Sequence, residues 1–171
     1  MKHLALIALT ACTPAEESKS TGSPEPAPSC APEDHDTLSL SIGTGQGDEF
    51  NALTEGEAVT LSVAPQGGYG VSIRAKTTGL NTEEPIDVLL ETEIDGALSG
   101  SFVNVGTNLY CQDDGLGLLW GVVVGFSQDT FPTPDALIAL DGEEALLIVE
   151  ATDMDGRSAR DEIMITVDVG G

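Results

Sequence analysis

Histidine and basic side chains are scarce in this 171-residue sequence. It has two histidines, His3 and His35, and six Lys or Arg residues against 29 Asp or Glu residues. Both histidines precede residue 37, so the rest of the chain has no imidazole to serve as a general base or a zinc ligand. This argues against Ser-His-Asp, Cys-His and zinc chemistry in residues 37–171. The sequence also has no glycine-rich phosphate loop leading into a helix.

Positive charge is nearly missing from the long C-terminal part of the chain. Residues 37–171 contain four basic and 23 acidic residues, a net charge of −19. Binding to nucleic acid depends on Lys and Arg that neutralise phosphates, and flat binding to anionic lipid needs the same residues. We therefore expect neither nucleic acid nor a lipid surface as a direct ligand of this region, whose charge favours solubility.

The sequence lacks an apolar run long enough for a membrane-spanning helix at its N-terminus. The run at residues 4–11 follows Lys2 and His3, and it is far shorter than the roughly 20 residues a helix needs to cross a bilayer. A basic start, a short apolar centre and small residues at the end are typical of a secretory signal. Residues 1–11 are therefore predicted to be a signal peptide.

The end of that segment, Leu9-Thr10-Ala11-Cys12, resembles the lipobox of bacterial lipoproteins. The resemblance implies cleavage before Cys12, a diacylglyceryl group on its sulfur and acylation of the new amino terminus. Several acyl chains make a permanent membrane anchor. Thr13 follows where Asp would favour inner-membrane retention, which implies the outer membrane of a double-membraned bacterium. The alternative is an ordinary signal peptide with an incidental cysteine.

Proline-rich and strand-like regions divide the remainder. Residues 12–36 hold five of the nine prolines and no large apolar side chain, so we expect a disordered tether. Residues 37–171 have the length of one domain. Alternating or apolar segments bounded by turn residues recur along it, which predicts an all-β fold, an immunoglobulin-like antiparallel β-sandwich. The expected strands are residues 37–43, 57–64, 69–76, 85–94, 98–105, 117–126, 144–152 and 161–169.

Two turn regions carry resemblances. The segment "ATDMDGRSARDEIMITVDV" resembles the last hairpin of bacterial immunoglobulin-like modules of the PKD and cadherin-like type, which implies the fold and no activity. The segment "PQGGY" at residues 65–69 is similar to segments of secreted proteins from myxobacteria and their relatives, which implies a surface protein.

Carboxylates are the one abundant chemical group. Asp153, Asp155 and Asp161 surround the last turn, and Asp113 and Asp114 lie in "CQDDGLG". Calcium prefers six to eight oxygen ligands, so these residues are candidate calcium ligands. The alternative is that Asp-Gly simply forms the turn. Paired carboxylates can also hydrolyse glycosides, but chance pairs are unavoidable among so many acids.

The aromatic residues are few, seven in the whole chain. Trp120 lies in the most apolar expected strand, so we predict that it is buried as a core anchor. Stacking of Tyr69, Tyr110 and Trp120 on sugars is the alternative use of these rings.

The cysteine count predicts a disulfide. If Cys12 carries lipid, Cys30 and Cys111 remain as an even pair in an oxidising compartment. The alternative is a buried Cys111 and a free or intermolecular Cys30 thiol.

Together these features indicate a lipid-anchored, non-enzymatic protein of the cell envelope that serves as a binding or structural module. Expected partners are the membrane, through the lipid, and an envelope protein or polysaccharide. No cofactor is expected unless calcium binds. A calcium-dependent carbohydrate-binding module is the alternative, and a carboxylate-based hydrolase is third.

The lipid anchor is testable at Cys12. Cys12→Ser removes the sulfur that would be acylated, so we expect the variant to leave the membrane fraction or to remain unprocessed. Fractionation and intact mass measure this. Unchanged membrane association with an unmodified mass would contradict the lipobox assignment.

Overall fold

The computed structural model describes residues 29–63 and 68–170. The expected signal peptide, Cys12 and most of the expected tether lie outside these ranges. All eight expected strands are present, and the fold is all-β. The strands are β1 (Ser39–Thr44), β2 (Asn51–Ala52), β3 (Glu57–Val63), β4 (Tyr69–Thr78), β5 (Ile86–Ile94), β6 (Ala97–Thr107), β7 (Tyr110–Cys111), β8 (Gly117–Phe126), β9 (Glu144–Thr152) and β10 (Ser158–Asp168).

Two short helical turns accompany the strands. The 3-10 turn η1 (Pro32–Asp34) lies within the expected tether, so the described structure extends into its last part. The helix α1 (Pro134–Ile138) was not expected, because five residues are too few to show helical periodicity. The Thr133 side chain accepts a hydrogen bond from Ala136 N and caps this helix.

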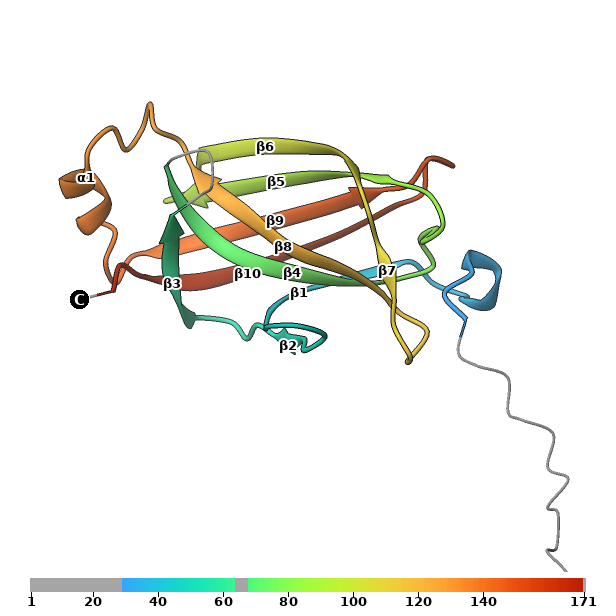
Figure 1. The fold of residues 1–171 in the computed structure, drawn as a ribbon. Coiled ribbons are helices and arrows are strands. Elements are labelled where there is room, and N and C mark those ends of the chain that lie inside the picture. Colours follow the sequence, from blue (N-terminus) through green and yellow to red (C-terminus); the bar gives the residue numbers. More distant parts are fainter. Residues whose placement is uncertain (1–28, 64–67, 171) are drawn as a thin grey trace, which may run out of the picture.

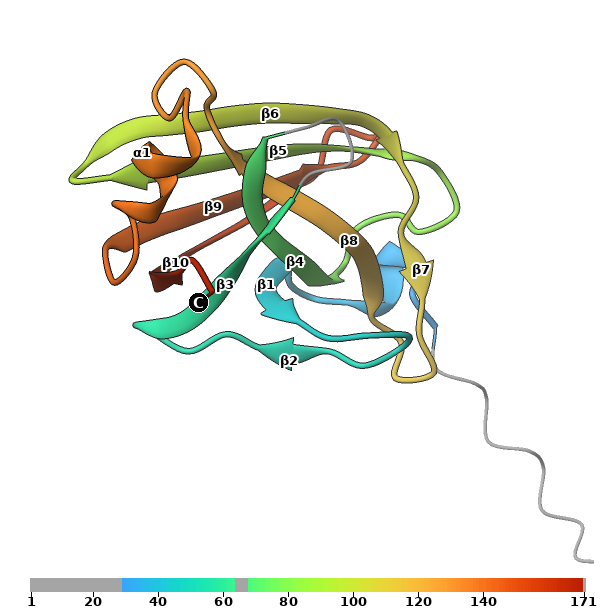
Figure 2. The same ribbon diagram turned by 60° about the vertical axis from the view of Figure 1, so that its left-hand side comes forward.

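The strands form two layers of a β-sandwich (Figures 1 and 2). In the first layer β4 is central, with β8 on one side and β1 and the end of β3 on the other. β2 continues this layer beyond β1, and β7 continues it beyond β8. In the second layer the order is β10, β9, β5 and β6, so that β6 forms its edge. This arrangement is compatible with the expected immunoglobulin-like type.

One strand connects the layers and departs from the expected antiparallel pairing. Residues 57–60 of β3 pair in parallel with β10, and residues 61–63 pair antiparallel with β4. Side chains alternate with a period of two in either kind of ladder, so the sequence pattern does not report the direction of a partner strand.

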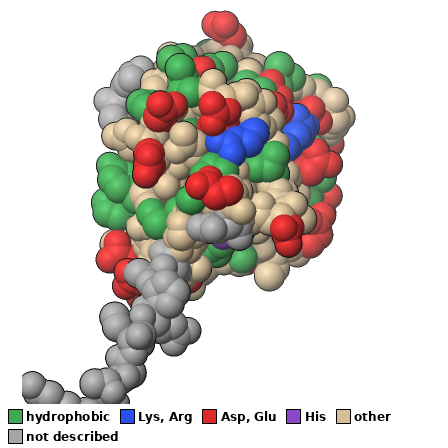
Figure 3. All heavy atoms as spheres, turned by 90° about the vertical axis from the view of Figure 1, so that its right-hand side faces the viewer, with side chains coloured by type: hydrophobic (Ala, Val, Ile, Leu, Met, Phe, Trp, Pro, Cys, Tyr) green, Lys and Arg blue, Asp and Glu red, His purple; other side chains and the backbone are tan. Residues whose placement is uncertain are grey.

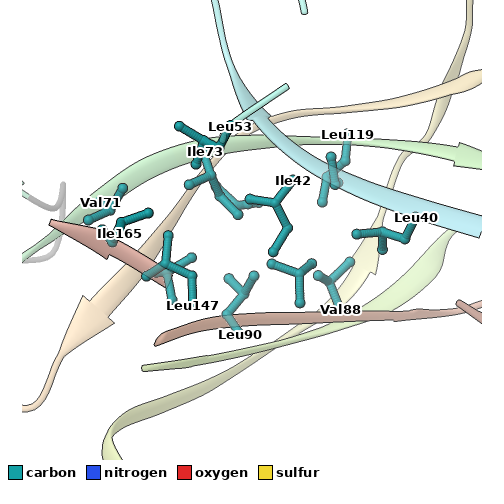
Figure 4. Close-up of a cluster of buried hydrophobic side chains, with 14 of the residues drawn as sticks. Leu40, Ile42, Leu53, Val71, Ile73, Val88, Leu90, Leu119, Leu147 and Ile165 are labelled. Atoms are coloured by element: carbon teal, nitrogen blue, oxygen red, sulfur yellow. The ribbon is translucent and has the colours of Figure 1, made fainter. Parts of the chain in front are cut away.

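The core lies between the two layers (Figure 4). Val71 and Ile73 of β4 and Leu119 of β8 face Val88 and Leu90 of β5, and all five are at most 1 % exposed. The alternation of buried positions along β4 and β5 produces the period of two that their sequences show.

The layers meet at one edge, where β6 approaches the end of β8. Ser127 N donates to Ser99 O at 2.7 Å, and Thr92 Oγ1 donates to Gly125 O at 3.1 Å. A Cβ added at Gly100 would lie 2.0 Å from Gly125 O, so only glycine fits there. The missing side chain thus permits a backbone contact between the layers.

The structure contains the predicted disulfide between Cys30 and Cys111, with Cα atoms 5.7 Å apart. It attaches the segment before β1 to β7. The bridge closes a sequence separation of 81 residues. On the chain-entropy model it stabilises the fold by roughly 4 kcal/mol.

The close approach of β6 and β8 predicts a strong effect of a single methyl group. Gly100→Ala places a Cβ against the backbone oxygen of Gly125, which cannot rotate away as a side chain could. We expect a loss of about 1–3 kcal/mol in the free energy of unfolding, measured by urea denaturation. Ser101→Ala at the next, exposed position is the control, and equal stability of the two variants would contradict the contact.

Candidate binding surface

The exposed hydrophobic side chains gather in one region of the sequence. Residues 96–112 contain no Asp, Glu, Lys or Arg, although the chain is strongly acidic. Of the nine exposed large hydrophobic residues in the described part of the chain, six lie between residues 97 and 120. We call these six the apolar strip: Leu98, Phe102, Val103, Val105, Tyr110 and Trp120. Successive residues such as Phe102 and Val103 lie on opposite faces of the sheet, so the strip is not one continuous surface. Its exposed apolar side chains on an otherwise charged domain are candidates for binding a partner.

Trp120 belongs to this strip, and the prediction that it is buried is wrong. Its side chain is 43 % exposed and stacks on Tyr110 of β7, with ring centroids 4.6 Å apart and an interplanar angle of 24°. The register of β8 with β4 shifts between Ile73 and Ala75, and Gly121 adopts a positive φ of 52°. This bulge turns Trp120 outward, between the buried Leu119 and Val122.

Two basic residues of β4 bind the β1–β2 and β7–β8 loops. Lys76 lies opposite Leu118, which lies opposite Tyr110, so these three positions share one face of the layer. Lys76 forms an ion pair with Asp114 of the β7–β8 loop. Its Nζ also lies 5.8 Å from the centroid of the Phe50 ring. Lys76 therefore links the loop after β7 to the loop before β2.

Arg74 holds the β1–β2 loop from the inside. Its Nη1 donates to Gly47 O at 2.5 Å and to Glu49 O at 3.0 Å, and the residue is 9 % exposed. Arg74 lies at the register shift opposite Trp120. The guanidinium group of Arg74 is thus hydrogen-bonded to backbone carbonyls and shielded from solvent.

An open hollow of about 420 Å³ lies between these two loops. Its lining includes Lys76 and the disulfide residue Cys111, and it is otherwise polar or acidic: Asp48, Gln112, Asp113 and Asp114. Figure 3 shows the end of the domain that faces right in Figure 1, where acidic groups are interspersed with hydrophobic and basic side chains.

The five candidate calcium ligands are divided among three places. Asp153 and Asp155 bind Arg157, with Nε–Oδ2 and Nη2–Oδ2 distances of 2.8 Å each. Asp161, further along β10, accepts a hydrogen bond from Ile42 N at 2.9 Å and so joins β10 to β1.

The other two, Asp113 and Asp114, lie in the β7–β8 loop, where Asp114 pairs with Lys76. Within residues 29–63 and 68–170, no group of three or more His, Cys, Asp or Glu side chains is arranged to hold a metal ion. Calcium binding stays a prediction.

Asp153 organises the last turn. Its side chain is fully buried, and it accepts hydrogen bonds from the backbone N–H groups of Asn81, Asp155 and Arg157 at 3.1, 3.0 and 2.9 Å. Burial raises the pKa of Asp153, but these hydrogen bonds and the charge of Arg157 outweigh it, so the pKa lies below its ordinary value. The carboxylate of Asp153 therefore stabilises the turn. This agrees with the alternative interpretation, in which the Asp-Gly pattern serves to form a turn.

The pKa of Asp114 is also lowered, although its side chain is more exposed than that of Asp153. Burial raises its pKa, while hydrogen bonds from Lys76 and from Leu116 N, together with the Lys76 charge, lower it overall. The exposed side chain gains little stability from this pair.

In the described part of the chain, no helix is long and apolar enough to cross a membrane. No protein-family model matches the sequence, and no curated protein matches it either. Among solved structures, the chain is similar to the CooA pilin subunit from enterotoxigenic Escherichia coli. The identity is 11 %, the match covers 79 % of this chain and 99 % of that chain, and the TM-score is 0.31. A likeness at this TM-score carries no argument about function.

The sequence contained a signal for the apolar strip that was not used. A run without charge at residues 96–112 stands out in a chain of which 20 % is charged. The alternating pattern alone placed residues 98–105 in an ordinary strand. A weaker signal in the sequence indicates that Trp120 faces outward. Gly121 follows it directly, and glycine within a strand often marks a bulge.

The pKa of Asp153 predicts an acid-sensitive turn. A lowered pKa in the folded state means that the stabilisation is complete above the unfolded value, about 3.9, and is lost as the pH falls below it. Asp153→Asn should cost about 1–3 kcal/mol at pH 7 and should reduce the loss of stability between pH 5 and pH 2. Thermal unfolding across this pH range measures both effects.

The matched control is Asp155→Asn, which touches the same arginine from an exposed position. We expect it to change stability by less than about 1 kcal/mol. Equal effects of the two substitutions would show that burial does not determine the contribution of Asp153 to stability.

Proposed function

We propose that this chain is a non-enzymatic binding module of the cell envelope, attached by lipid at Cys12, that binds a neutral polysaccharide through Tyr110 and Trp120. The observation that carries the proposal is the exposed, stacked aromatic pair. Tyr and Trp are enriched at binding surfaces because they offer a large apolar face and a polar edge. The flat apolar faces of sugar rings are suitable partners for such a pair.

The charge of the surroundings supports a neutral ligand. The nearby cations are already engaged, Lys76 by Asp114 and Arg74 by Gly47 and Glu49 carbonyls. The carboxylates of Asp48 and Asp113 line the adjacent hollow. An anionic polymer would meet repulsion there, whereas a neutral sugar can form hydrogen bonds with these groups.

The disulfide relates the binding surface to the proposed anchor. Tyr110 precedes Cys111, which is bonded to Cys30. Eighteen residues separate Cys30 from Cys12 in the sequence, so a fully extended chain would span about 60 Å. Anchoring at Cys12 would therefore keep Tyr110 and Trp120 within reach of polymers close to the membrane.

The aromatic pair can be tested by affinity electrophoresis of the full chain carrying Cys12→Ser, with soluble neutral polysaccharides (dextran, mannan and a β-glucan) cast into native gels. We expect retardation by at least one of them. Trp120→Ala and Tyr110→Ala should each weaken binding at least tenfold, with little change in melting temperature because both rings are half-exposed. Ile138→Ala, at an exposed apolar residue of α1 outside the apolar strip, is the control.

Retardation that survives Trp120→Ala, or none with any of the polysaccharides, would overturn the proposed surface. Repeating the gels with millimolar calcium separates the calcium-dependent alternative. A ligand that favours the native state must raise the melting temperature, so an increase with calcium alone would support that alternative.

A further inference from the structure

In the part of the chain that the structure describes, the outer edge of β6 is free along most of its length. β6 pairs with β5 on one side and ends the second layer. On its other side the end of β8 reaches it at Ser99 and Gly100. Among the described residues, no strand pairs with the far side of residues 101–107. Figures 1 and 2 both show β6 along the margin of the molecule.

This edge carries almost none of the features that normally prevent strands from pairing between molecules. Natural edge strands are protected by Lys, Pro, short length or bulges. β6 has eleven residues and none of them is charged or proline. Two bulges lie toward its ends, but the register from Gly100 to Asn104 is regular. Val103 and Val105 are 60 % and 77 % exposed.

We propose that β6 pairs with β6 of a second copy of this chain, antiparallel across a two-fold axis, so that the second layers of the two copies form one continuous sheet. A two-fold contact brings the same patch of each copy together, so the patch must be compatible with itself. An uncharged strand with exposed Val103 and Val105 meets that requirement, because its side chains can pack on identical ones.

The distribution of charge favours a second copy at this place and disfavours it elsewhere. Each copy carries −19 in residues 37–171, so most surfaces of two copies repel. The carboxylates nearest to the edge belong to β5, where Asp87 and Glu91 accept hydrogen bonds from Gly106 N and Ser101 Oγ. In the proposed pair the two β5 strands lie three strand spacings apart, about 14 Å.

This spacing predicts how association depends on salt. The Debye length is about 8 Å at physiological ionic strength, so the remaining repulsion between the β5 carboxylates is screened there and grows at low salt. Self-association should therefore become stronger as salt increases. A basic partner bound to the same edge would show the opposite dependence.

Sedimentation equilibrium of the full chain tests the proposal, in a Cys12→Ser background that excludes lipid and an intermolecular disulfide at that residue. We expect a dimer whose dissociation constant falls several-fold between 50 and 500 mM NaCl. Val103→Lys and Val105→Lys together should raise the constant at least tenfold. Both positions are exposed, so the melting temperature of the monomer should change little.

The control is Leu38→Lys, which adds the same charge at an exposed apolar residue just before β1, in the other layer. It should leave the dimer intact. Hydrogen exchange should also show slower amides at residues 101–105 in the dimer. A chain that stays monomeric at millimolar concentration, a dimer that survives both lysines, or unchanged exchange in β6 would each overturn the proposal. None of these results bears on polysaccharide binding by Trp120.

Discussion

The contact between Gly100 and Gly125 is the constraint on which the two notable surfaces depend. It brings β6 of one layer against the end of β8 in the other, at a distance that leaves no space for a Cβ. From there the strands separate toward β7, as Figure 1 shows. Among the described residues, the separation leaves residues 101–107 of β6 without a partner strand on the side away from β5. It also leaves β7 as the only partner strand of β8 on that side, where Tyr110 meets Trp120.

The four basic residues after position 37 are all used to hold the structure together. Arg74 binds loop carbonyls and Lys76 pairs with Asp114. Arg157 closes the last turn through Asp153, and Arg160 pairs with Glu150 and Glu162. Every cation in this part of the chain thus has an anionic or carbonyl partner, and the excess of carboxylates makes the domain strongly negative overall. Uncharged side chains, not charges, then distinguish one region of it from another.

Several features could be predicted because they depend on local pattern or on counting. Strands such as β1 and β5 alternate between buried and more exposed positions, and the even pair Cys30 and Cys111 remains once Cys12 is assigned to lipid. The direction of Trp120 could not be predicted in this way. Both the odd-numbered and the even-numbered positions of β8 are apolar, so its sequence does not show which face is buried. The bulge beside Gly121 determines which face Trp120 occupies. The β3–β10 pairing is parallel for a similar reason, since period-two alternation is the same for both directions.

The sequence by itself determined the all-β class, the positions of the eight longer strands, the acidic charge and the residues available for a disulfide, because each of these follows from nearby residues or from composition. Only the tertiary structure decided which apolar side chains remain in water. Burial depends on whether a second layer covers a strand, and that depends on contacts between residues far apart in the chain. Thr92, Ser99 and Gly125 form such a contact, and Trp120, Val103 and Val105 are exposed beyond it.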